Sequence, residues 1–172
     1  MRKILKRERI FKGKLLNLYL EKQRFPSGYL ANLEVIEHPG AVLIIPFLSK
    51  HKIILIKQYR PVISSYIWEL PAGTLHKNEN LLSCAKRELV EEIGYIAKKW
   101  EKIGHIYPAP GYTTEKILIF KACGLKKVES EKEEDEIINP KIFLKSEIVR
   151  LFKSGNIVDS KTICALKLAE IL

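Results

Sequence analysis

Residues 73–95 read GTLHKNENLLSCAKRELVEEIGY, and this stretch decides the fold. The spacing predicts a helix over Leu81–Ile93, because apolar residues recur there at intervals of three and four. Asn80 is a favourable N-cap, and Gly94 is the residue type that most often ends a helix. The apolar face of this helix is expected to pack into the core. It consists of Leu82, Ala85, Leu89 and Ile93.

Three glutamates lie beside that apolar face. At about 100° per residue, Glu88 and Glu92 are neighbours on the helix surface, with Glu91 close to them. Carboxylates at positions i and i+4 repel each other, so the arrangement costs free energy in an isolated helix. Two interpretations are open from the spacing alone. One is a solvated acidic face relieved by Lys86 and Arg87, and the other is a site for a hard cation such as Mg²⁺ or Mn²⁺.

The order of residues around the helix resembles the Nudix box, the signature of the Nudix hydrolases. Gly73 is followed by five residues and then Glu79, and seven further residues lead to the run RELVEEIGY at 87–95. The one departure is Tyr95, where that family prefers an aliphatic residue. The match spans the whole stretch, so it is far more specific than a short glycine motif.

This resemblance implies that Glu88 and Glu92 are catalytic and bind a divalent metal. Glu91 lies nearby as a further ligand, and the carbonyl oxygen of Ala72 is expected to add another.

Other positions of the box are implied to be structural. These are Gly73, Glu79, Arg87 and Gly94. Gly73 is expected to let the backbone turn tightly. Arg87 is expected to pair with Glu79 and so to fix the loop on the helix.

Beyond the box, the sequence resembles the ADP-ribose pyrophosphatase subfamily over nearly its whole length. The matching segments are FKGKLLNL at 11–18, EVIEHPGAV at 34–42, KQYR at 57–60 and WELPAG at 68–73. The resemblance implies that Arg60 contacts the substrate diphosphate and that Glu115 accepts a hydrogen bond from a ribose hydroxyl. Pro110 and Gly111 would form the Pro-Gly loop of that subfamily.

A run of four acidic residues, EEDE at 133–136, falls where the subfamily places its acidic catalytic loop. The best register makes Glu134 the general base and Glu136 a metal ligand. Glu133 and Asp135 remain alternatives for either role.

The remaining pattern predicts a mixed α/β (α+β) protein. Strands are predicted at 16–20, 29–36, 41–48, 52–59, 68–70, 100–107 and 115–122, and C-terminal helices at 146–154 and from Asp159 or Ser160 to the end. The resemblance implies a Nudix α/β/α sandwich with a mixed sheet. Residues 1–38 would be an N-terminal β-rich segment for dimerisation and the substrate pocket, and 39–172 the Nudix domain.

Composition bounds the remaining possibilities. A chain of 172 residues, 47% hydrophobic and 29% charged, is expected to form one folded domain rather than a disordered chain. No apolar run is long enough for a membrane span, and the start has no signal-peptide pattern. Three widely spaced cysteines argue against a disulfide framework or zinc ribbon and favour the cytoplasm.

The expected function is therefore magnesium-dependent hydrolysis of ADP-ribose to AMP and ribose 5-phosphate by a homodimer, with Mn²⁺ as a possible substitute. One alternative is a Nudix hydrolase acting on another nucleoside diphosphate sugar or a dinucleoside polyphosphate. Another is a non-catalytic ADP-ribose sensor. The net charge of +10, concentrated in residues 1–30, also permits nucleic-acid binding. That interpretation ranks last, because no known recognition module accompanies the charge.

Overall fold

The computed structural model describes residues 3–129 and 137–172, which form two compact units. The first unit comprises the residues up to Gly40 together with Tyr107–Lys116. The second comprises Ala41–Ile106 and Ile117–Leu172. The place of 107–116 in the first unit was not foreseen.

An antiparallel sheet in the order β1-β2-β3 forms the first unit. Its strands are β1 (Lys3–Lys12), β2 (Asn17–Arg24) and β3 (Leu30–Glu37). The segment 107–116 is bonded to β3, because the Ile36 N–H donates to the Tyr112 carbonyl at 2.7 Å and Ile36 in turn accepts from the Thr114 N–H at 2.9 Å.

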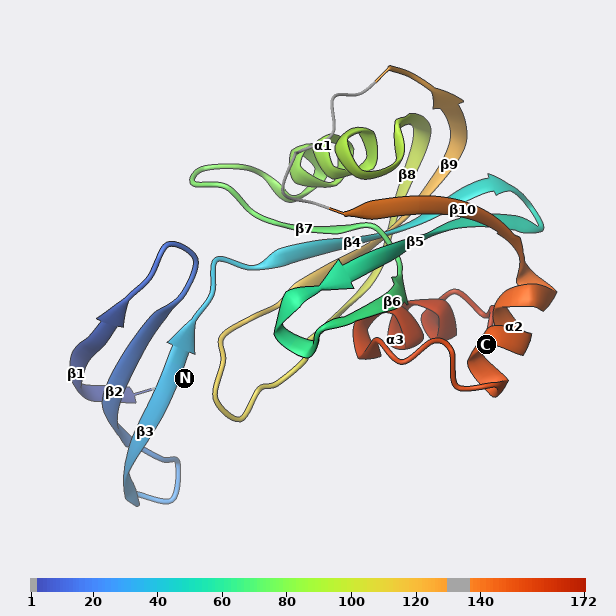
Figure 1. Ribbon diagram of the computed structural model, residues 1–172. Helices are drawn as coiled ribbons and strands as arrows, with labels where there is room; N and C mark the ends of the chain where they lie inside the picture. The colour runs from blue at the N-terminus through green and yellow to red at the C-terminus, as the bar shows by residue number, and fades with distance from the viewer. Residues whose placement is uncertain (1–2, 130–136) are drawn as a thin grey trace. The chain divides into compact units, whose positions relative to one another are not determined.

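A seven-stranded mixed sheet forms the centre of the second unit (Figure 1). Five strands lie in the order β10-β5-β4-β9-β8, while β6 pairs with β5 and β7 pairs with β4. The bounds are β4 (Ala41–Ser49), β5 (Lys52–Arg60), β6 (Ser65–Glu69), β7 (Ala72–Thr74), β8 (Tyr95–Ile106), β9 (Ile117–Lys127) and β10 (Ile138–Leu144), with a short 3₁₀ turn at Pro61–Ile63. Strands β4 and β9 run parallel and the other pairs are antiparallel.

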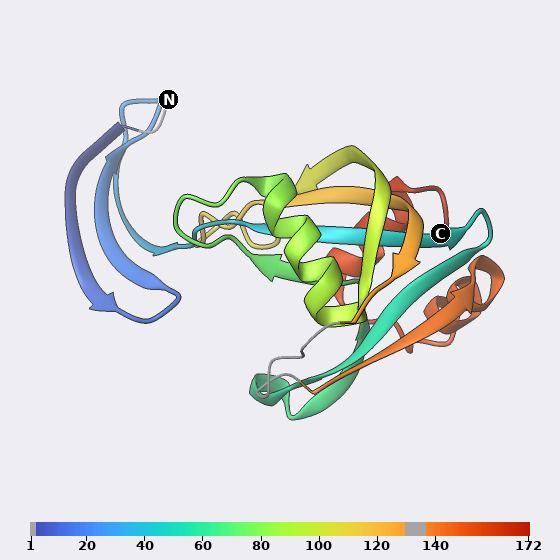
Figure 2. The same cartoon turned by 90° about the horizontal axis from the view of Figure 1, so that it is seen from above.

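Helices cover both faces of this sheet (Figures 1 and 2). Side chains of a strand alternate between faces, so β4 contributes Val42 and Ile44 to one side and Leu43, Ile45 and Phe47 to the other. The first set packs with helix α1 (Leu81–Ile93). The second packs with residues of α2 (Lys145–Lys153) and α3 (Ser160–Leu168). The predicted α/β/α sandwich is confirmed.

The centre of the sheet also fixes the start of the box. Strand β7 pairs with the beginning of β4, with Ala72 opposite Leu43 and Thr74 opposite Ala41. All residues of β4 from Ala41 to Phe47 are buried, as expected for a strand covered on both faces. The start of the box is therefore anchored to a buried central strand of the sheet.

Three strands were not foreseen, namely β1, β7 and β10. Strand β1 is rich in Lys and Arg and exposed along its whole length. Strand β10 pairs with β5 along its whole length, from Ile138 opposite Gln58 to Leu144 opposite Lys52. In the described parts of the chain, no helix combines the length and apolar character needed to cross a membrane.

Candidate active site

Helix α1 begins and ends where its sequence predicts. The side chain of Asn80 accepts the Ser83 N–H at 2.9 Å, which satisfies one of the unpaired donors of the first turn. Gly94 adopts a left-handed conformation with φ of 71°, and its N–H donates to the Val90 carbonyl at 2.9 Å. Such a conformation strongly favours glycine.

The buried face of α1 differs by one position from the expected one. Ala85, Leu89 and Ile93 are buried, but Leu82 is 37% exposed and Cys84 is fully buried in its place. Burial is the main reason that the pKa of Cys84 rises to about 12. The thiol is therefore protonated at neutral pH, which makes Cys84 a packing residue rather than a nucleophile.

Two of the three helix glutamates lie on the buried side of the helix. Glu88 is 9% exposed and Glu92 only 4%. The carboxylate of Glu92 accepts the Ala72 N–H at 3.0 Å, so it points at strand β7. Burying two carboxylates on neighbouring helical turns costs free energy unless hydrogen bonds or cations stabilise them. A solvated acidic face is therefore excluded for this pair.

Gly73 provides the space that Glu88 occupies. A Cβ atom at position 73 would lie 1.7 Å from Oε1 of Glu88 and 1.8 Å from its Cδ. Because Gly73 is the middle residue of strand β7, its importance lies in this close approach, not in the tight turn that was expected. The carboxylate lies directly against the backbone of the box loop.

Arg87 connects the loop and the helix. Its guanidinium donates to both carboxylate oxygens of Glu79, with Nε–Oε1 at 2.9 Å and Nη2–Oε2 at 3.0 Å. Nη1 also donates to Glu88 at 2.7 Å and to Glu91 at 2.8 Å. The expected Arg87–Glu79 pair is present, and the same guanidinium additionally donates hydrogen bonds to two helix glutamates.

Comparison with known proteins agrees with this geometry. Residues 37–166 match the NUDIX domain. The chain belongs to the NUDIX family.

Two relatives align with this NUDIX protein over nearly its full length. ADP-ribose pyrophosphatase of Bacillus subtilis (strain 168) is 36% identical over 171 residues, which cover 98% of this chain and 92% of that protein. The methanol dehydrogenase activator of Bacillus methanolicus is 34% identical over the same length and coverage. A crystal structure described as an ADP compounds hydrolase superposes with a TM-score of 0.83, covering 98% of this chain and 92% of that one. At 24% identity it supports the fold alone.

NUDIX hydrolases generally use divalent metal ions, and the donor set on α1 fits such an ion. Carboxylate oxygens held on a rigid helix are the ligands that Mg²⁺ and Mn²⁺ prefer. Within residues 3–129 and 137–172, however, no three His, Cys, Asp or Glu side chains form a ready-made metal site. In this structure the guanidinium of Arg87 engages Glu88 and Glu91.

Arg60, at the end of β5, forms a second ion pair in the same unit. Nε and Nη2 donate to the two oxygens of Glu69, each at 2.6 Å. The hydrogen bond to Glu69 is the main cause that raises the pKa of Arg60, and the charge of Glu92 contributes as well. The negative charge of Glu92, a residue of the box, therefore acts on Arg60. Glu69, which lies in WELPAG, was not singled out from the sequence, although a carboxylate within an apolar run is a sign of a buried pair.

The remaining sequence-predicted residues fall elsewhere. Pro110, Gly111 and Glu115 belong to the first unit, where Glu115 lies 4.0 Å from Nε2 of His38. The acidic positions Glu134 and Glu136 lie outside the described residues, as do their alternatives. The roles of all these residues stay predictions.

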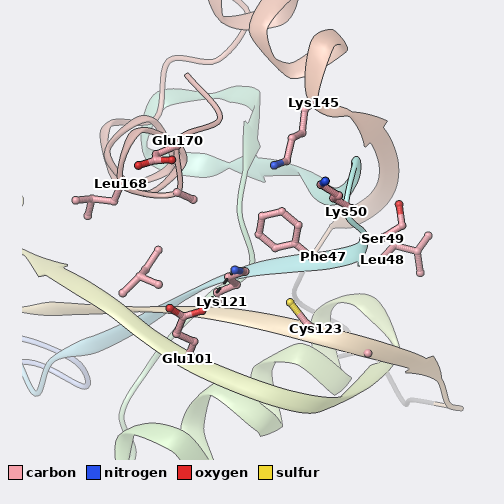
Figure 3. A pocket seen from close by; sticks show the side chains of 13 residues that line it. Phe47, Leu48, Ser49, Lys50, Glu101, Lys121, Cys123, Lys145, Leu168 and Glu170 are labelled. Atoms are coloured by element: carbon pink, nitrogen blue, oxygen red, sulfur yellow. Dashed lines mark hydrogen bonds and ion pairs between the residues drawn. The ribbon is translucent and has the colours of Figure 1, made fainter.

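A cavity of about 630 Å³ lies in the second unit (Figure 3). Phe47 lines it together with Lys121 of β9 and Lys145 of α2, whose ammonium nitrogens lie 5.4 and 5.2 Å from the ring centre. Phe47 points to the face of β4 opposite α1. None of the predicted site residues in the described ranges lines this cavity, so it does not belong to the box.

Glu79→Gln is expected to destabilise the protein at neutral pH and to have less effect in acid. The hydrogen bond from Arg87 is the main reason that the pKa of Glu79 falls to about 2. The pKa of Glu79 is lower in the folded protein than in the unfolded chain, so the ionised carboxylate stabilises the fold. This stabilisation is fully present above the unfolded pKa of about 4.3 and is lost as the pH falls towards about 2. Urea unfolding of both proteins between about pH 7 and about pH 3 measures this difference. A difference that stays constant over that range would contradict the assignment.

Proposed function

We propose that this protein hydrolyses the diphosphate of ADP-ribose to AMP and ribose 5-phosphate. The observation that carries the proposal is the buried pair Glu88 and Glu92 of the NUDIX box, of which Glu88 lies against Gly73 and Glu92 accepts the Ala72 N–H. The likeness to a full-length relative named ADP-ribose pyrophosphatase supports the choice of substrate.

The chemistry requires water to attack one phosphorus while the bond to the bridging oxygen breaks. Bound Mg²⁺, or Mn²⁺ in its place, supplies charge neutralisation of the diphosphate and acidifies the attacking water. Glu88, Glu92, Glu91 and the Ala72 carbonyl would hold the metal, with Glu136 as a further ligand. Glu134 would accept the proton of the water.

Substrate contacts are proposed for four residues outside the box helix. Arg60 would donate bidentate hydrogen bonds to a phosphate, which its planar guanidinium suits. Glu115 would accept from a ribose hydroxyl. Pro110 and Gly111 would shape the loop next to it.

The proposed assembly is a homodimer built through the first unit. Apolar side chains on this sheet and its turns are strongly exposed; examples are Ile10 at 50%, Phe11 at 60% and Tyr29 at 66%. A small sheet that leaves such side chains in water is stabilised when another surface covers them. Sedimentation equilibrium would give about twice the chain mass of 19.8 kDa, whereas a mass equal to the chain would refute the dimer.

The location proposed for the enzyme is the cytoplasm. All three cysteines are free thiols, and this agrees with a reducing compartment.

The decisive experiment measures release of AMP and ribose 5-phosphate from ADP-ribose with Mg²⁺ and with EDTA. A nucleoside diphosphate sugar and a diadenosine polyphosphate serve as competing substrates. EDTA-sensitive cleavage that favours ADP-ribose is expected. Preference for another compound would keep the box chemistry and remove the substrate assignment. Tight ADP-ribose binding without cleavage of any compound would make the protein a sensor.

Glu134→Gln is expected to lower kcat by about 10² to 10⁴ with a smaller change in KM, because a general base acts mainly in the transition state. Glu133→Gln and Asp135→Asn are the matched controls from the same acidic run. If one of these, and not Glu134→Gln, causes the loss of kcat, the register of the run shifts by one residue.

A further inference from the structure

Glu69 is a buried carboxylate that two cations share. It is 0% exposed and accepts both hydrogen bonds of Arg60 at 2.6 Å. The ammonium group of Lys161 donates to the same carboxylate, at Oε2. Burial is the largest single influence on the pKa of Glu69 and by itself would raise it. Arg60 and Lys161 together nevertheless hold this pKa below its ordinary value. Glu69 is therefore a carboxylate anion between an arginine and a lysine.

The lysine comes from the beginning of α3, a helix outside the box. Asp159 caps this helix by accepting the Thr162 N–H at 3.0 Å, and it also accepts from Nζ of Lys161 at 2.9 Å. The buried hydroxyl of Thr162 accepts the Leu70 N–H at 2.9 Å. The first turn of α3 thus holds two consecutive positions, Glu69 and Leu70, immediately before the box.

The two cations that contact Glu69, Lys161 and Arg60, differ in how tightly they are held. Lys161 is held between two carboxylates and is 19% exposed, whereas Arg60 is 39% exposed and lies in the field of Glu92. If Arg60 were the only partner, turning it towards a phosphate would leave a buried carboxylate without a cation, which is strongly unfavourable. With Lys161 in place, Glu69 stays neutralised while Arg60 is shared with an anionic ligand.

We propose that Lys161 is a positioning residue for the phosphate-binding arginine. It holds and neutralises Glu69, and through Glu69 it sets the direction and the availability of the Arg60 guanidinium. The inference rests on the proposed function, because it takes Arg60 to contact the diphosphate.

The test compares steady-state kinetics of Lys161→Met, Arg60→Met and the double variant with ADP-ribose and Mg²⁺. Lys161→Met is expected to raise KM about tenfold with little change in kcat, as loss of a substrate-binding interaction would. Lys161→Arg is expected to restore KM. The double variant should equal Arg60→Met alone, because Lys161 acts through Arg60. Calorimetric titration with ADP-ribose in EDTA gives the same comparison without turnover.

Lys167→Met is the matched control. Lys167 lies on the same helix and donates only to the Leu172 carbonyl among the contacts described for it, so its KM should stay unchanged. If Lys161→Met does not fold, Lys161→Gln keeps a hydrogen-bond donor without the charge and takes its place.

Each outcome decides a separate question. A normal KM in Lys161→Met beside a raised KM in Arg60→Met overturns the positioning role. Additive losses in the double variant also overturn it, since Lys161 would then act on the fold in general. A normal KM in Arg60→Met removes the proposed phosphate contact itself and leaves hydrolysis by the box untouched.

Discussion

Glu92→Gln is expected to abolish metal-dependent hydrolysis while the protein stays folded. Glu92 is 4% exposed and accepts the Ala72 N–H, which a glutamine oxygen can still accept. The change removes a negative charge beside Glu88, so a repulsion between buried carboxylates disappears with the ligand. Loss of a charged ligand at the reacting centre should lower kcat/KM on the order of 10³-fold.

Hydrolysis of ADP-ribose, together with circular dichroism and thermal unfolding, measures this result. Glu101→Gln is the control, because it makes the same chemical change at a side chain that is 65% exposed on β8. If Glu92→Gln keeps a near wild-type rate, the metal assignment on α1 is wrong. If both variants lose activity equally, the effect comes from net charge.

Gly73→Ala is expected to lower both activity and stability, although it adds a single methyl group. The new Cβ would lie 1.7 Å from Oε1 of Glu88, so either the carboxylate or strand β7 has to move. Forcing extra volume into a packed site typically costs about 1–3 kcal/mol. A shift of about 1 Å in a ligand that orients the reaction costs about 10² in rate.

A double-mutant cycle separates the steric effect from a general effect on the strand. In a Glu88→Ala background the clash is absent, so Gly73→Ala should then have little effect on the unfolding free energy. Gly104→Ala on β8 is the control, since its Cβ would meet only the end of the Leu168 side chain at 3.3 Å. Equal destabilisation in both backgrounds would disprove the close approach as the cause.

Whether an element of this fold can be predicted depends on whether the residues that determine it lie within that element or elsewhere in the chain. Helix α1 was predicted at about Leu81–Ile93 because its limits are set locally, by the Asn80 cap and the left-handed Gly94. Strand β1 has no such signal. Its Lys and Arg residues suggest a charged surface, and only the pairing with β2 makes it a strand. Strand β10 likewise could not be predicted from its own residues, because its pairing with β5 defines it.

The same distinction applies to the candidate site. The grouping of the α1 glutamates follows from their helical spacing, whereas the pair Arg87–Glu79 was implied by the resemblance to the Nudix box. The prediction that Leu82 is buried was wrong, because the α1 face that packs on Val42 and Ile44 includes Cys84 instead. Lys161 lies 92 residues from Glu69, and no local pattern relates the two.

The contacts of Arg87 lead to an expectation for the protein when no metal is bound. The guanidinium pairs with Glu79, Glu88 and Glu91, so one cation lies among three carboxylates of the box. Proteins whose fold depends on a metal unfold when a chelator removes it. Here Arg87 and the Ala72 N–H already donate hydrogen bonds to the helix glutamates, and we expect inhibition by a chelator to be fully reversible when the metal is restored.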